Sequence, residues 1–191
     1  MLKKIFCIGI LLAVLINVSI VNAQDNNKII DFGHRLTLGT YYSYTENVVG
    51  IMEPMYDFII NVPYINSKYN LLDFGIGISV IMAFDGNGNV RLPTIGFGLN
   101  GSMRIYSPYV RNARVFADGI MSLVVYTKNY PENGTKINGG WHIGGGFEYR
   151  LEDSTKIFTS INWFHNSNND VYGRERNPAI NAIGFMTGLQ Y

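Results

Sequence analysis

The feature that most constrains the fold is a strict alternation of side-chain types between residues 72 and 84. Every second residue there is large and apolar: Leu72, Phe74, Ile76, Ile78, Val80, Met82 and Phe84. A period of two residues is that of a β-strand, whose side chains point alternately to opposite faces. The segment is therefore predicted to be one long strand with a continuous apolar face.

The opposite face of this strand is unusual for a water-soluble protein. Its residues are small or polar, as for Asp73, Gly75, Gly77, Ser79 and Ala83, with Ile81 as the exception. A soluble antiparallel sheet buries its apolar face and exposes bulky polar side chains to water. An apolar outer band with small or polar residues inside is typical of a membrane β-barrel. The same pattern recurs over residues 95–106 and 141–151.

Applying the same rule to the whole chain predicts eight strands. They cover residues 35–45, 54–63, 69–84, 93–106, 112–127, 139–151, 155–167 and 179–191. Most reach the roughly 9 to 11 residues that a tilted strand needs to cross a bilayer. Eight strands suit the smallest closed membrane barrels. The predicted fold is thus all-β, an eight-stranded antiparallel transmembrane β-barrel.

The sequence also predicts what surrounds and fills this barrel. Aromatic residues near strand ends are expected to form girdles at the membrane interfaces, as for Tyr44, Tyr56, Phe84, Tyr106, Tyr126 and Tyr149. Charged residues of inward parity are expected to fill the lumen: Asp57, Asp73, Arg104, Asp118, Glu148 and Arg150. The outer loops are expected over residues 46–53, 85–92, 128–138 and 168–178, and to be longer than the periplasmic turns.

The first 23 residues are predicted to be a secretory signal peptide. Lys3 and Lys4 precede an apolar run that continues to about Val21, and the small residue Ala23 ends the segment. An uncleaved membrane helix is the alternative, but no stop-transfer charge cluster follows. Cleavage leaves residues 24–191 as the barrel and removes the single cysteine, Cys7. The expected location is the bacterial outer membrane.

Composition and spacing argue against several classes of function. The formal net charge is +1, without the basic excess expected of a nucleic-acid-binding protein. One cysteine supplies neither a disulfide framework nor a thiolate metal site. Residues 96–101 match the GxGxxG pattern, but they lie within a predicted strand and not in a strand-turn-helix unit. We therefore expect no nucleic-acid partner, no metal and no cofactor.

The predicted strand 155–167 carries two polar residues on its lipid-facing side. Ile161 and Trp163 define that side, and His165 and Ser167 continue it. Polar groups facing lipid cost free energy. Either this strand end has reached the headgroup layer, or the pair carries out chemistry on a lipid.

The spacing permits the chemical alternative. Residues i and i+2 of a strand lie roughly 6.8 Å apart on one face, so His165 can act as general base for Ser167. A third group should orient the imidazole. Asn181, on the neighbouring strand, and Glu175, in the preceding loop, are the two candidates.

The segment His165-Asn166-Ser167-Asn168, followed by Asn177-Pro178, resembles the signature of outer-membrane lipid A 3-O-deacylases, also called acyloxyacyl hydrolases. The match covers about residues 163–184. The resemblance implies an eight-stranded barrel that removes an ester-linked acyl chain from lipopolysaccharide at an external, lipid-facing site. It also implies Ser167 as nucleophile, His165 as base and Asn168 as a contributor to oxyanion stabilisation.

The chain departs from that family at three positions. Asn169 stands where the family commonly has alanine, and Ala179 where it often has glycine. Asn181 stands where the best-known members have a carboxylate. An asparagine can hold the tautomer of a histidine, but it stabilises the imidazolium less than a carboxylate does.

The predicted function is a serine esterase that hydrolyses an acyl ester of lipid A in the outer leaflet, among the lipids of the outer membrane. The main alternative is a non-catalytic structural or adhesion barrel whose loops bind a partner. A third is an acyltransferase that uses the same lipid. The acyl chain removed, the choice between Asn181 and Glu175, and formation of a homodimer are left open.

Overall fold

The computed structural model describes residues 31–45, 48–62, 72–85, 93–151 and 155–191. The predicted signal peptide lies outside the described residues. The strands are β1 (Asp31–Ser43), β2 (Val48–Val62), β3 (Leu72–Asp85), β4 (Thr94–Tyr106), β5 (Ala113–Tyr130), β6 (Thr135–Arg150), β7 (Lys156–Ser167) and β8 (Ile180–Gln190). A short 3-10 helix, η1 (Arg174–Arg176), lies between β7 and β8.

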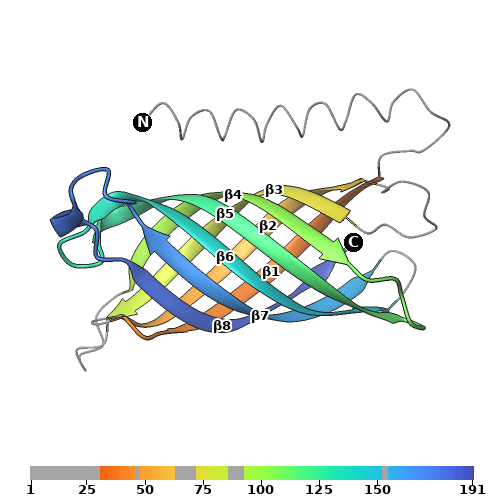
Figure 1. Ribbon diagram of the computed structural model, residues 1–191. Helices are drawn as coiled ribbons and strands as arrows, with labels where there is room; N and C mark the ends of the chain where they lie inside the picture. The colour runs from red at the N-terminus through yellow and green to blue at the C-terminus, as the bar shows by residue number, and fades with distance from the viewer. Residues whose placement is uncertain (1–30, 46–47, 63–71, 86–92, 152–154) are drawn as a thin grey trace. The chain divides into compact units, whose positions relative to one another are not determined.

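The eight strands form a closed barrel (Figure 1). Each strand pairs antiparallel with its neighbour in sequence, and β8 closes the sheet by pairing with β1. Closure leaves no strand edge without a partner, as the interior of a bilayer requires. The prediction of an eight-stranded antiparallel barrel is confirmed.

The start of the second strand differs from the prediction. β2 begins at Val48, six residues before Pro54, although a proline in a sheet usually stands at the first residue of a strand, on an edge strand or at a bulge. Pro54 pairs with Leu38 of β1. On the other side of β2, residues 53 and 54 have no paired residue in β3, because the proline has no N–H to donate.

The predicted outer loop over 128–138 is mostly strand. β5 continues to Tyr130 and β6 begins at Thr135, so that only residues 131–134 form the turn. The side-chain amide of Asn138 donates to the carbonyl of Tyr130 at 2.9 Å, which helps to hold this hairpin together. The predicted long outer loop was therefore wrong here, whereas the connection 168–179 is longer than the turn 107–112 at the other end of the barrel, as predicted.

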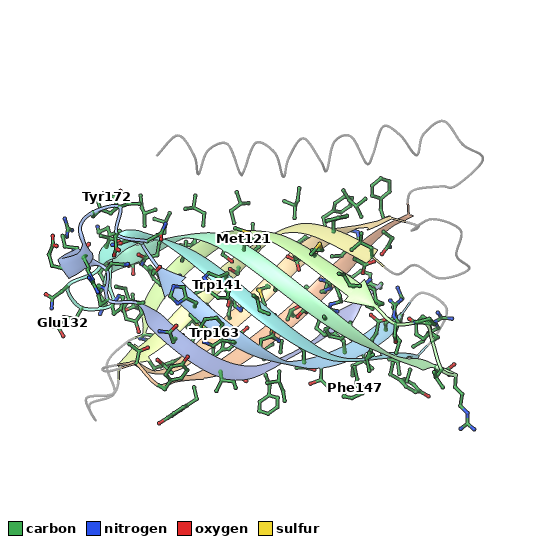
Figure 2. The ribbon with its side chains drawn as sticks, in the orientation of Figure 1. Met121, Glu132, Trp141, Phe147, Trp163 and Tyr172 are labelled. Carbon is green, nitrogen blue, oxygen red and sulfur yellow. The ribbon has the colours of Figure 1, made fainter. Side chains whose placement is uncertain are left out.

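The outer face of the barrel is apolar. Burial alternates along β4 with the predicted parity, and Phe97 and Leu99 are more than half exposed on the outer side. Similar side chains project from the other strands, among them Met121 and Phe147 (Figure 2). A band of exposed apolar residues around a closed barrel is the surface of a membrane protein. In the described ranges, no helix is long and apolar enough to cross a membrane.

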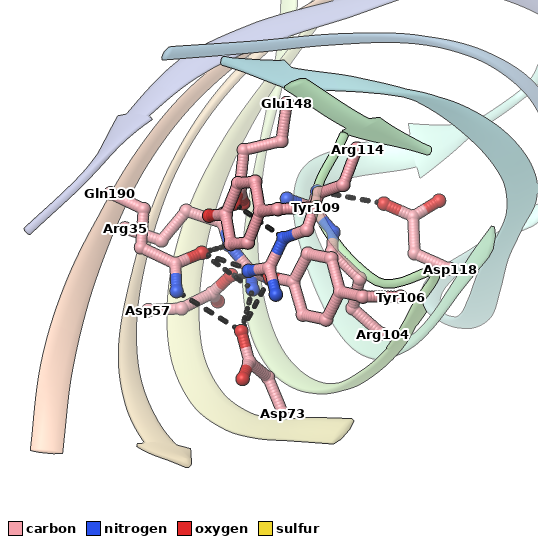
Figure 3. Close-up of polar contacts among 10 residues, drawn as sticks. All are labelled: Arg35, Asp57, Asp73, Arg104, Tyr106, Tyr109, Arg114, Asp118, Glu148 and Gln190. Carbon is pink, nitrogen blue, oxygen red and sulfur yellow. Dashed lines mark hydrogen bonds and ion pairs between the residues drawn. The ribbon is translucent and has the colours of Figure 1, made fainter. Parts of the chain in front are cut away.

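Paired charges fill one end of the lumen (Figure 3). Arg104 pairs with Asp118 at 2.8 Å, and Arg114 with Glu148 at 2.7 Å. Arg35 reaches Asp73 at 3.3 Å. Buried charges are tolerated when they are paired and hydrogen-bonded, so these pairs form a polar plug. The predicted inward positions of Asp57, Asp73, Arg104, Asp118 and Glu148 are confirmed, whereas Arg150 is half-buried at the end of β6.

Two tyrosines predicted for the interfacial girdles lie in the lumen instead. Tyr106 and Tyr126 are 4% and 2% exposed. Tyr106 shares the parity of Arg104, and its hydroxyl donates to Asp73. Parity along a strand, and not distance from its end, decides which face a side chain takes. Tyr44, Tyr56, Phe84 and Tyr149 are exposed on the outer surface as predicted.

Candidate active site

His165, Ser167 and Asn181 form a hydrogen-bonded chain on the outer surface of the barrel. The Nε2 atom of His165 lies 3.1 Å from Ser167 Oγ. Its Nδ1 atom lies 2.8 Å from Asn181 Oδ1. Asn181 is the direct cross-strand partner of His165, which places the two side chains on the same face. The order of hydroxyl, imidazole and orienting group is that of a catalytic triad.

The orienting group determines which nitrogen of His165 carries the proton. The Oδ1 atom of Asn181 only accepts hydrogen bonds, so Nδ1 must be the donor of this pair. In the neutral ring Nε2 is then unprotonated and accepts the hydroxyl proton of Ser167. This tautomer is the one that a general base for Ser167 requires.

The last residue of β1 and the two residues that follow it hold Asn181 in place. The N–H of Asn181 donates to Thr45 Oγ1 at 2.8 Å, and its carbonyl accepts from the N–H of Tyr44 at 3.2 Å and from the hydroxyl of Ser43 at 3.1 Å. These contacts close the barrel beside the site. Sequence reasoning missed Thr45, because the residues are 136 positions apart and only the β8–β1 closure brings them together.

Glu175, the alternative orienting group, does not contact the imidazole. It lies in η1 and is exposed, with its carboxylate against Gly173 of the same loop. Within the described ranges, no ion pair joins His165 to a carboxylate. The structure therefore brings Asn181, and not Glu175, to His165.

Asn168 is hydrogen-bonded to the loops around the site. Its side-chain amide donates to Thr135 Oγ1 at 3.1 Å and to the carbonyl of Arg176. Its N–H donates to Asn177 Oδ1 at 2.8 Å. These bonds tie the β5–β6 hairpin to the β7–β8 connection. An oxyanion contact from Asn168 would require one of them to break, and that role stays a prediction.

The surroundings of the triad are apolar and aromatic. The rings of Trp141 and Trp163, on the neighbouring strands β6 and β7 (Figure 2), lie 5.3 and 6.1 Å from the ring of His165. Gly139 is the cross-strand partner of Ser167 and leaves the surface beside the hydroxyl free of a side chain. In the described part of the chain, no cluster of three or more His, Cys, Asp or Glu residues could hold a metal ion.

The protein is an integral membrane β-barrel, as its closed sheet, its outer apolar band and the paired charges in its lumen indicate. His165, Ser167 and Asn181 form a candidate active site on the outer surface of this barrel. A closed eight-stranded barrel with this surface is the architecture of bacterial outer-membrane proteins, and solved structures share its fold. The fold is similar to that of the outer membrane enzyme PagL, with a TM-score of 0.61 and 7% sequence identity, over 81% of this chain and 97% of that chain.

The fold is also similar to that of Neisserial surface protein A (NspA). That TM-score is 0.56 with 9% identity, over 83% of this chain and 94% of that chain. No protein-family model matches the sequence, and no curated protein matches it significantly. At these identities the likeness is one of fold.

Proposed function

We propose that this protein is a lipid A deacylase, a serine esterase that hydrolyses an ester-linked acyl chain of lipopolysaccharide. The observation that carries the proposal is the hydrogen-bonded chain from Ser167 through His165 to Asn181 on the lipid-facing surface. The similarity in fold to the outer membrane enzyme PagL supports it.

The geometry supports a two-step mechanism. Ser167 Oγ attacks the carbonyl carbon of the acyl ester while its proton passes to His165 Nε2. The bond between that carbon and the alcohol oxygen of the ester then breaks, and His165 returns the proton to this leaving oxygen. Water, deprotonated by His165, attacks the acyl-enzyme in turn. Fatty acid leaves, and the Ser167 hydroxyl is restored.

The position of the site along the barrel supports lipopolysaccharide as the substrate. His165 and Ser167 lie at the end of β7, and Asn181 near the start of β8. The start of β1 and the end of β8 lie at the opposite end of the barrel. With that end in the periplasm, as the predicted signal peptide implies, the site would face the outer leaflet, which contains lipopolysaccharide.

A non-catalytic barrel explains the polarity of this strand end but not its organisation. Polar side chains in the headgroup layer can each be hydrated separately. Here the imidazole is hydrogen-bonded at both nitrogens, and its cross-strand partner Asn181 is itself hydrogen-bonded to Thr45. Such order costs side-chain entropy, which a catalytic role explains.

Mass spectrometry of lipid A tests the proposal. Lipid A from cells that express the wild type should lose one ester-linked acyl chain, and Ser167→Ala and His165→Ala should abolish the loss. Ser160→Ala is the matched control, because Ser160 lies on the same strand but is buried in the lumen. An unchanged acylation pattern with the folded wild type would overturn the proposal. Appearance of the chain on a phospholipid would instead identify an acyltransferase.

A further inference from the structure

We infer that Trp141 stabilises the positive charge that forms on His165 during catalysis, a task that a carboxylate performs in most serine hydrolase triads. Trp141 is thus a positioning residue that acts through His165. The inference rests on the proposed function and deepens it.

The third group of a triad has two tasks: it orients the imidazole, and it stabilises the imidazolium formed when the serine proton is transferred. The Oδ1 atom of Asn181 performs the first, at 2.8 Å from Nδ1. It carries no net charge for the second. Within the described ranges no carboxylate forms an ion pair with His165. A cation on a surface that faces lipid is costly without compensation.

Trp141 occupies the position from which an aromatic ring can supply that compensation. His165 has two direct cross-strand partners, Asn181 on β8 and Trp141 on β6. The ring centroids of Trp141 and His165 are 5.3 Å apart, with an interplanar angle of 45°. A cation within about 6 Å of an aromatic centroid is attracted to the π-face, and tryptophan is the strongest such partner. The attraction increases where water is excluded.

The second tryptophan holds the first in position. The rings of Trp163 and Trp141 meet edge to face, with centroids 4.4 Å apart and an angle of 89°. The indole N–H of Trp163 donates to the hydroxyl of Tyr44 at 2.8 Å. The sequence contains two tryptophans, and both lie beside His165. A simple anchoring role at the membrane interface is the competing explanation, and it predicts no dependence on the residue at position 181.

A double-mutant cycle separates the two explanations. The rate of acyl release from lipid A in mixed micelles is measured for Trp141→Leu in the wild type and in Asn181→Asp. We expect Trp141→Leu to lower kcat about fivefold with little change in KM. In Asn181→Asp, where a carboxylate supplies the charge, the loss should be under about twofold. Trp141→Phe should retain intermediate activity, because a weaker π-face remains.

The control variant is Tyr42→Leu, which removes an exposed aromatic of β1. It should leave kcat unchanged. Folding of every variant is checked by migration on unheated gels. Equal losses from Trp141→Leu in both backgrounds, a change confined to KM, or no loss at all would overturn the inference.

A fluorophosphonate probe distinguishes failure of the inference from failure of the proposed function. Ser167 Oγ attacks its phosphorus, the P–F bond breaks, fluoride leaves and the proton passes to His165. If the wild type is labelled at Ser167 but leaves lipid A intact, the substrate is wrong, and the same cycle measured on labelling rates decides the role of Trp141. If the wild type neither reacts with the probe nor hydrolyses lipid A, both proposals fall.

Discussion

The absence of a side chain at Gly139, beside Ser167, leads to a testable prediction. Gly139 is the cross-strand partner of Ser167 and is exposed on the outer face. An added Cβ would find its nearest neighbour, the carbonyl oxygen of Ser167, at 3.7 Å, an ordinary contact. Alanine and larger side chains therefore fit at this position without straining the barrel. They would occupy the space through which an ester carbonyl approaches the hydroxyl.

The size of the effect follows from the distances. Cβ atoms of directly paired residues lie about 4.5 to 5.5 Å apart, and the reacting carbonyl must come within about 3 to 3.5 Å of the nucleophile. A leucine at position 139 would overlap that volume, and displacement of the substrate by about 1 Å can cost about 100-fold in rate. We expect Gly139→Leu to lower kcat/KM about 100-fold, equivalent to about 2.7 kcal/mol. Gly139→Ala should cost less than about threefold.

Both variants are assayed as purified barrels by release of fatty acid from lipid A, with the folded fraction measured on unheated gels. Both should remain folded. If Gly139→Leu is folded and keeps kcat/KM within about threefold of the wild type, the substrate does not approach over β6 and the reasoning is refuted.

Three further predictions concern the supports of the site and the barrel. Thr45→Val removes the hydroxyl that accepts a hydrogen bond from the N–H of Asn181. The kcat should fall about fivefold, as expected for loss of one hydrogen bond. An unchanged kcat would contradict a role for Thr45 in holding Asn181. Asp118→Leu leaves Arg104 buried without its ion-pair partner and should lower the free energy of unfolding, measured in urea, by about 3 to 5 kcal/mol. Adding Arg104→Met to the same chain should restore most of that loss. If the losses from the two substitutions were instead additive, the ion pair would be excluded. Gly146→Ala would overlap the carbonyl oxygen of Thr159 and should prevent folding, whereas a normal yield of folded barrel would show that β6 and β7 can separate there.

Alternation along single strands was enough to predict the barrel and the face on which the candidate site lies. His165 and Ser167 continue the parity of Trp163, and the structure places all three on the outer side. The same rule, applied consistently, would also have assigned Tyr106 to the lumen. Grouping it with the girdle because it lies near a strand end was the source of that error.

Contacts between strands were harder to predict, because they depend on register. The proximity of Trp141 to His165 is set by the β6–β7 pairing, and the contact of Thr45 with Asn181 by the closure of β8 on β1. A shift of one residue in either pairing would move the partner to the opposite face. Single-strand patterns carry no information on that shift. The extension of β5 and β6 was missed for the same reason, since pairing between the strands, and not apolar alternation, stabilises it.

The charged plug of the lumen has a consequence for how the proposed deacylase would meet its substrate. Because ion pairs fill one end of the lumen, an acyl chain cannot pass through the barrel, and the candidate site is reached from the surrounding lipid. Encounters therefore take place by lateral diffusion in a single leaflet. The quantity that sets the rate is the mole fraction of substrate in that leaflet, so dilution with inert lipid at constant bulk concentration should slow turnover. An inhibitor would have to partition into the membrane before it could compete.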